Sequence, residues 1–305
     1  MFVGHGLVAF AIATSVASRR GWDSDRALAV GVVAGLFATV PDIDMAYAVV
    51  GLVGSFEGVI AASDAFWAAA HEVHRAVTHS VVVGVIGAVG FACWRARSRR
   101  SLGALAVAVL AGLVAVVAVT TSPLAATLLG AFVLAGLGIV SVAEQYGFGA
   151  RTVLAAALLG LVSHPFGDLL TGQPPALLYP IDAVVLSERV ILHADPTLHL
   201  LGAFFVELAT LWLALLVVVR VRGSRVFPHV RPRAVLGVGY GAAILAVPTP
   251  TVEVASPFVF SVLSVGLVAI PVRSRDRWTW VETISTALAA VTVAALAYTG
   301  AYLLV

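Results

Sequence analysis

Residues 197–219 read TLHLLGAFFVELATLWLALLVVV. Among them, Glu207 is the only Asp, Glu, Lys or Arg residue. An α-helix rises about 1.5 Å per residue, so a run of this length can cross the hydrocarbon core of a bilayer, which is about 30 Å thick. Comparable runs recur along the 305-residue chain, which is 61% hydrophobic and 11% charged. We therefore expect lipid to be the solvent for most of the chain, and we predict an all-α polytopic membrane protein.

The apolar runs predict about ten transmembrane helices within one integral membrane domain, residues 1–305. Two of the runs, the second and the eighth, are short, so counts of nine or eleven remain open. The predicted spans are residues 2–17, 27–40, 80–94, 102–119, 124–143, 152–170, 197–219, 234–247, 255–272 and 283–303.

The arginines predict the orientation of these spans. The chain contains 18 arginines and no lysine, and basic residues collect in cytoplasmic loops. If the N-terminus is outside, 16 arginines fall in or beside cytoplasmic loops and only Arg75 and Arg189 fall on the other side. Arg19 and Arg20 follow the first apolar run, which is the reverse of a cleavable signal peptide, so this run should remain as a helix. We predict a multi-pass protein of the cell (plasma or inner) membrane with both termini on the non-cytoplasmic side.

Composition also narrows the partners. The single cysteine, Cys93, excludes a disulfide framework and a thiolate metal site. The net charge of +2 reflects the arginines of the cytoplasmic loops, and basic residues are not interleaved with aromatic ones as in nucleic-acid-binding proteins. The expected partner is the lipid bilayer rather than nucleic acid, and the sequence does not specify an oligomeric state.

Most of the remaining ionisable residues gather on the outer face of the predicted bundle. Taken singly, each has a structural explanation, such as a helix cap or a solvated loop position. As a group they are unusual, because ionisable side chains at membrane depth are costly and normally face a cavity or one another. We therefore predict a polar cavity in the outer half of the bundle, lined by His5, Asp42 and Asp44 of PDID, His74, Arg75 and His79 of HRAVTHS, and His164 and Asp168 of SHPFGDLLTG.

These residue types favour a transition metal in that cavity. His164 and Asp168 are four residues apart and share a face of a continuous helix, whereas Asp42 and Asp44 share a face only if the segment after Pro41 is extended. Imidazole and carboxylate together suit Zn, Mn or Fe. The candidate ligands exceed the needs of one tetrahedral ion, so we predict one or two divalent ions, with Zn or Mn favoured, that make a bound water acidic enough to attack at neutral pH.

The segment HEVHRAVTHS, residues 71–80, restricts which of its side chains can share a site. His74 and His79 lie about 140° apart around an ideal helix, so they cannot both face one ion from a regular helix. We expect His79 to be a ligand and His74 to be either a ligand from a distorted turn or a neighbour of the ligands. Arg75 can share a face with His79 and suits an anionic group such as phosphate.

The ordered set of motifs resembles the YdjM-like family of membrane-bound metal-dependent hydrolases, also described as LexA-binding inner-membrane proteins. The similarity covers residues 1–180, including Pro180, and no motif is matched in residues 181–305, which hold the outer loop and the C-terminal helices. Pro165 departs from the expected pattern and predicts a helix break at His164. The resemblance implies a hydrolase assisted by Arg75 and Thr78, with a metal held by His5, Asp42, Asp44, His74, His79, His164 and Asp168.

Glu207 belongs to none of these motifs. Counted at about 1.5 Å per residue from the cytoplasmic end of its span, it lies about 18 Å up, at the same height as His5 and His164. One interpretation is a protonated glutamic acid that is hydrogen-bonded between helices. The other is that Glu207 faces the metal cavity, as an extra ligand or as the base that takes a proton from bound water.

A second polar cluster lies in the long outer loop, before the seventh predicted span. It consists of His193, Asp195 and His199 in the stretch HADPTLH. We interpret it as interfacial loop polarity.

The predicted function is hydrolysis of an ester or phosphoester, carried by a lipid or a phosphorylated small molecule, at the non-cytoplasmic face. A phosphatase of the type-2 phosphatidic acid phosphatase kind also uses His-x-x-x-Asp, but this sequence lacks the arginine and the Pro-Ser-Gly-His of that family. A transporter or a channel for ions or protons is an alternative that an inverted repeat would support, and we find none. A non-enzymatic, metal-stabilised scaffold is the third alternative.

Overall fold

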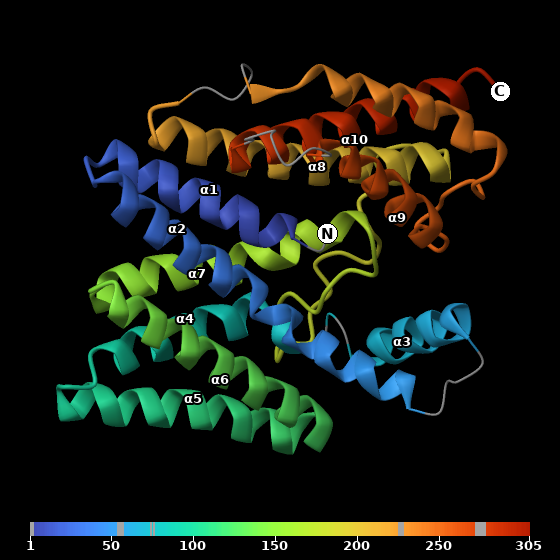
Figure 1. Ribbon diagram of the computed structural model, residues 1–305. Helices are drawn as coiled ribbons and strands as arrows, with labels where there is room; N and C mark the ends of the chain where they lie inside the picture. The colour runs from blue at the N-terminus through green and yellow to red at the C-terminus, as the bar shows by residue number, and fades with distance from the viewer. Residues whose placement is uncertain (1–2, 54–57, 74, 76, 225–228, 272–278) are drawn as a thin grey trace. The chain divides into compact units, whose positions relative to one another are not determined.

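The computed structural model describes residues 3–53, 58–73, 75, 77–224, 229–271 and 279–305. Every regular element in these residues is an α-helix or a 3₁₀-helix, as Figure 1 shows, which confirms the predicted all-α class. The chain divides into two compact units. The N-terminal unit contains residues 2–169 and 173–189, and the C-terminal unit contains residues 170–172 and 190–305, with Met1.

The N-terminal unit carries all the predicted motifs, and polar caps fix where several of its helices begin. Asp23 accepts a hydrogen bond from the Arg26 amide at 2.9 Å at the start of α2, and Ser80 caps α4 in the same way. The elements are α1 (Gly4–Arg19), α2 (Ser24–Thr39), η1 (Pro41–Leu52), α3 (Val59–Val73), η2 (Val77–His79), α4 (Val81–Arg95), α5 (Arg100–Thr120), α6 (Pro123–Gln145), α7 (Ala150–Gly167) and η3 (Asp168–Leu170).

Helix α2 packs against both α1 and α7, and glycine makes the approach to α7 close. A Cβ atom at Gly160 of α7 would lie 2.6 Å from both the Ala34 carbonyl oxygen and the Ala38 amide nitrogen of α2. Small residues allow helix backbones in membranes to approach in this way. The contact lies one turn before His164 and sets the distance between that residue and α2.

The segment that follows α7 is hydrogen-bonded to the residues around Arg75 and Ser80. The Ala176 amide donates to the Arg75 carbonyl at 3.2 Å, and the Val81 amide donates to the Leu177 carbonyl at 2.9 Å. The Ser80 hydroxyl donates to the Tyr179 carbonyl at 2.7 Å. These bonds hold segments far apart in sequence side by side within the N-terminal unit.

The C-terminal unit is built on α10, which packs against α8 and the 3₁₀-helix η5. Its core contains the fully buried rings of Phe258 and Tyr298, whose centroids lie 5.0 Å apart. Asp195 caps α8 and its carboxylate also accepts a hydrogen bond from the Tyr302 hydroxyl at 3.0 Å. The elements are α8 (Pro196–Val221), η5 (Pro232–Leu245), α9 (Ser256–Ser264), η6 (Val265–Ala269) and α10 (Trp280–Tyr302).

Five helices of the described chain are long and apolar enough to cross a membrane. A sixth candidate is the pair α2 and η1, which is bent by 50° at the break. The other predicted spans form shorter helices, so the count of about ten stays a prediction. The five are Arg100–Thr120, Pro123–Gln145, Ala150–Leu170, Pro196–Val221 and Trp280–Tyr302, and the shorter apolar helices are Val81–Arg95, Pro232–Leu245 and Ser256–Ala269.

Candidate metal centre

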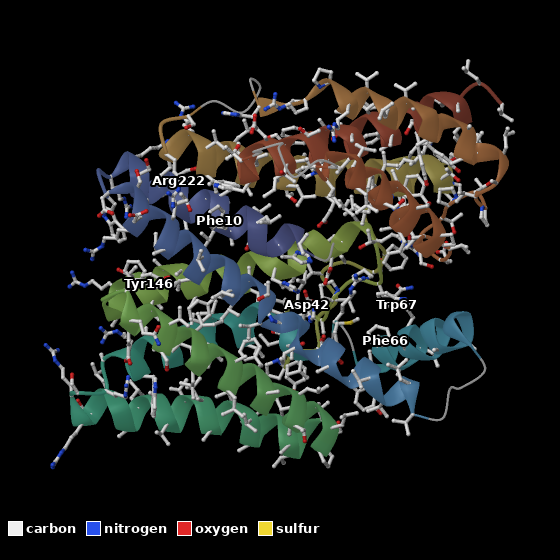
Figure 2. The ribbon with its side chains drawn as sticks, viewed as in Figure 1. Phe10, Asp42, Phe66, Trp67, Tyr146 and Arg222 are labelled. Carbon is white, nitrogen blue, oxygen red and sulfur yellow. The ribbon has the colours of Figure 1, made fainter. Side chains whose placement is uncertain are left out.

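Four of the predicted ligands come together in the N-terminal unit. One ligand atom from each of Asp42, His79, His164 and Asp168 lies within 4.8 Å of the other three. Three separate segments supply them: the junction of α2 and η1, labelled at Asp42 in Figure 2, the end of η2, and the end of α7. The group combines two imidazoles with two carboxylates, which is a donor set suited to Zn or Mn.

The spacing of the four ligand atoms fits one ion. The Nε2 atoms of His79 and His164 are 3.0 Å apart, and Asp168 Oδ2 lies 3.2 Å from His79 Nε2. Asp42 Oδ1 lies 3.6 Å from His79 Nε2 and 3.4 Å from His164 Nε2. Donors at about 2.0–2.2 Å from a tetrahedral ion are about 3.3–3.6 Å from one another. With the 3.9 Å between His164 Nε2 and Asp168 Oδ2, five of the six separations run from 3.0 to 3.9 Å, on both sides of these values.

The other nitrogen of each histidine ring is already engaged. His164 Nδ1 lies 2.6 Å from the Ala38 carbonyl oxygen, and His79 Nδ1 lies 3.3 Å from Asp44 Oδ2. A carbonyl or carboxylate oxygen accepts only, so each Nδ1 carries the hydrogen and donates it. In a neutral ring this leaves a lone pair on Nε2. With both rings neutral, the two lone pairs face each other and two carboxylate oxygens, and a proton added to His79 would occupy its Nε2.

Thr78 reinforces this arrangement around His79. Its hydroxyl donates to Asp44 Oδ2 at 2.8 Å, and its oxygen lies 3.0 Å from His79 Nδ1. Hydrogen bonds of this kind orient the ring of a metal-binding histidine and fix its tautomer. Thr78 and Asp44 thus lie on the Nδ1 side of the ring, away from the four ligand atoms.

The carboxylates around His79 favour the binding of positive charge. Burial alone would lower the pKa of His79, but its hydrogen bonds with Asp168, Asp42 and Asp44 raise the pKa to about 10. A proton on His79 neutralises this negative charge only in part, and a divalent cation neutralises more of it. The two compete, because a histidine must be deprotonated to bind a metal.

Asp42 is the least buried of the four residues. Its side chain is 26% exposed, whereas those of His79 and His164 are fully buried. Asp168 is also buried, with 3% of its side chain exposed. The Asp42 side of the group is therefore its least enclosed side.

His5 and Arg75 surround the opposite edge of Asp168. His5 Nε2 and Arg75 Nη2 each lie 3.3 Å from Asp168 Oδ1, while Oδ2 faces the other ligands. The His5 ring packs 4.2 Å, centroid to centroid, from the ring of His164. A Cβ atom at Gly167 would overlap the His5 ring, so this glycine makes room for the histidine.

The structure decides one condition that the sequence left open and corrects one local prediction. The segment after Pro41 is a 3₁₀-helix rather than extended, so Asp42 and Asp44 point to different sides of His79. Helix α7 does not break at His164 but continues through Pro165 to Gly167. Proline is tolerated there because it lies within the last turn, where it removes a single backbone hydrogen bond close to the helix end. His164 and Asp168 therefore keep their i, i+4 relation, with Nε2 and Oδ2 3.9 Å apart.

Sequence reasoning missed the contribution of Ala38. Its carbonyl oxygen orients His164, and no side-chain pattern marks a backbone atom of an apolar helix. The role of Gly167 could be predicted only weakly, from its place as the glycine of SHPFGD. His74, one of the predicted ligands, lies outside the described residues.

The remaining predicted residues lie in the C-terminal unit. Glu207 is half-buried in α8, and its role in catalysis stays a prediction. Asp195 Oδ1 accepts a hydrogen bond from the Leu198 amide at 2.8 Å, and His199 Nδ1 accepts one from the Leu192 amide at 3.2 Å. These bonds support the start of α8, as expected for polar residues at the end of a loop.

Comparison with known proteins places the whole motif-bearing region in one family. A family model described as YdjM inner membrane protein matches residues 1–227. The match includes every predicted ligand and continues through α8 and Glu207, beyond the motifs that first indicated the resemblance. No curated protein and no solved structure matches the chain.

Proposed function

The chain belongs to the YdjM inner membrane protein family, and from this membership and the ligand cluster we propose that it is a membrane-embedded, metal-dependent hydrolase. The proposed substrate is an ester or phosphoester, carried by a lipid or by a phosphorylated small molecule. The proposed place of reaction is the non-cytoplasmic face of the membrane.

One observation supports the metal most directly. The Nε2 atoms of His79 and His164 lie 3.0 Å apart while both Nδ1 atoms donate elsewhere. With both rings neutral, the two Nε2 lone pairs and the two carboxylate oxygens repel one another unless a positive charge lies among them, and a divalent ion supplies more of that charge than a proton on His79. We propose a single divalent ion, Zn or Mn, at this position, since the four atoms complete the set that one ion needs.

Each surrounding residue has a defined part in the proposal. Asp44 and Thr78 fix the ring of His79, and the Ala38 carbonyl fixes the ring of His164. His5 and Arg75 hold Asp168 by its second oxygen. The ion would lower the pKa of a bound water so that it can attack at neutral pH. The partly exposed side at Asp42 admits that water and the substrate.

The test is the metal content of the purified full-length protein, measured by elemental analysis after addition of Zn or Mn and removal of excess ion. We expect about one ion per chain in the wild type, and strong loss in His79→Ala and His164→Ala. His193→Ala is the matched control, because this histidine is exposed and belongs to the C-terminal unit.

Hydrolysis of p-nitrophenyl esters, measured on the same samples, should follow the metal content. Wild-type protein that retains no ion, or histidine variants that retain it fully, would contradict the metal centre. Protein that holds the ion but hydrolyses neither carboxylic nor phosphate esters would leave a metal site without the proposed activity.

A further inference from the structure

Arg75 is held beside the metal centre in an unusual backbone conformation. Its φ angle is +69°, and it is the only residue other than glycine with a positive φ in the described chain. A residue with a Cβ atom disfavours this left-handed region. The Ala176 amide nevertheless bonds to the Arg75 carbonyl, and this places the guanidinium next to Asp168. Such outliers occur where a side chain must be aimed at a functional site.

The guanidinium uses only part of its hydrogen-bonding capacity. Nη1 donates to the Gln173 carbonyl at 3.3 Å, and Nη2 lies 3.3 Å from Asp168 Oδ1. Nε is shielded from solvent and has no hydrogen-bond partner among the described residues. Arginine has five N–H donors in a planar fork, so three of them are left over, one of them in a buried position where an unmet donor is costly.

The contact with Asp168 does not explain this fork. It is a single contact with one oxygen, whereas arginine and carboxylate usually pair through two parallel hydrogen bonds. The side chain is 14% exposed, so a ligand can still reach it. Asp168 presents Oδ2 to the ligand cluster and Oδ1 to Arg75. Only the Asp168 carboxylate therefore separates the unused N–H donors of Arg75 from the proposed ion.

We infer that Arg75 binds a tetrahedral oxyanion and so selects phosphate esters over neutral carboxylic esters at this centre. The inference rests on the proposed metal-dependent hydrolysis. The planar fork complements two oxygens of a phosphoryl group, while the metal centre beside it takes the remaining charge. Free phosphate esters and phospholipid headgroups share this chemistry, and the experiment separates them.

The first measurement is the thermal shift that inorganic phosphate causes in metal-loaded, full-length protein. Phosphate should stabilise the wild type, and its apparent affinity should fall about 10- to 100-fold in Arg75→Gln. Arg75→Lys keeps the charge but loses the fork, so we expect a clear loss there too. Arg151→Gln is the matched control, because Arg151 is exposed at the far end of α7.

Elemental analysis of every variant separates this inference from the proposed function. Arg75→Gln should lose phosphate binding and keep most of the metal, because His5 still contacts Asp168 Oδ1. If it responds to phosphate as the wild type does, or if it loses metal and phosphate together, Arg75 only positions Asp168 and the inference is wrong. A wild type without metal would overturn the proposed function and this inference with it.

Hydrolysis assays then identify the source of the phosphate. Arg75→Gln should lose far more activity towards p-nitrophenyl phosphate, or towards phosphatidic acid in mixed micelles, than towards p-nitrophenyl acetate. Loss in the soluble assay alone would indicate a small phosphate ester, and loss in the micelle assay alone a lipid. Equal loss towards the neutral ester would contradict the selectivity.

Discussion

Thr78 shows how much of the centre depends on residues that do not face the ion. Its hydroxyl joins Asp44 to the Nδ1 side of His79. We expect Thr78→Val, which keeps the shape and removes the hydroxyl, to lower metal affinity about 10- to 100-fold. Competition with a chelator of known affinity measures the change.

Thr78→Ser provides the control, because it keeps the hydroxyl and should keep most of the affinity. Val and Ser variants with the same metal affinity as the wild type would show that Asp44 alone orients His79.

The predicted role of Glu207, as an extra ligand or a base at the metal cavity, rests on its position within a span and on no motif. Glu207→Gln keeps the size of the side chain and most of its hydrogen bonding. If Glu207 serves the centre, as a ligand or as a base, this variant should lose metal or hydrolysis while its thermal stability stays near that of the wild type. A variant that keeps both would identify Glu207 as a helix-packing residue.

At the scale of single residues, the sequence indicated which side chains gather but not which of them form the central group and which orient it. Asp42, His79, His164 and Asp168 were all predicted, and the structure brings them together. The division between these four and the residues that orient them was not predictable, because it depends on which ring nitrogen faces which oxygen. That relation is set by tertiary packing rather than by spacing in the chain.

At the scale of elements, the close contact of α2 and α7 places His164 against Ala38. Gly160→Ala would put a Cβ atom against the backbone of α2, and overpacking of this kind typically costs about 1–3 kcal/mol. We expect a lower melting temperature and weaker metal binding, since the helices must separate. Thermal unfolding and chelator competition measure the two effects.

Gly138→Ala in α6 is the matched control. A Cβ atom there meets nothing within 4 Å, so the gain in helix propensity, about 0.5–1 kcal/mol, should leave the protein equally or more stable. If Gly160→Ala behaved like this control, the close contact of α2 and α7 would not matter for the centre.

The prediction of elements succeeded where the signal was a long apolar run. Such runs predicted α5, α6, α8 and α10 because length and hydropathy suffice to identify a helix that fits a bilayer. They did not predict that residues 41–52 and 232–245 form 3₁₀-helices. A 3₁₀-helix rises about 2.0 Å per residue, and apolar content alone does not distinguish it from an α-helix.

At the scale of the whole molecule, orientation is the prediction most exposed to a direct test. Only Arg75 and Arg189 were placed outside, so positions in the stretches 41–79 and 171–196 should face the non-cytoplasmic side. Cys93 is the only cysteine. In a Cys93→Ala background, single cysteines at exposed positions of these stretches should react with an impermeant reagent applied to intact cells.

Cysteines placed next to Arg97 or Arg222 serve as the opposite control, and they should react only after the membrane is opened. The reverse pattern of labelling would contradict the predicted orientation and place the proposed site on the cytoplasmic side. The ten-span count depends on the same data, because several of the predicted spans form helices shorter than those of the five clear candidates.

The distances along the chain between the ligands have a consequence for biosynthesis. His79 and His164 are 85 residues apart, and Ala38 and His164 are 126 apart. No ribosome-bound fragment that ends before Asp168 holds the complete set, so the proposed ion could bind only after α7 has joined the other helices. The proposed ion would then close a long loop of chain late in biosynthesis, so cells starved of the metal should accumulate an inserted, metal-free protein that is more open to proteolysis.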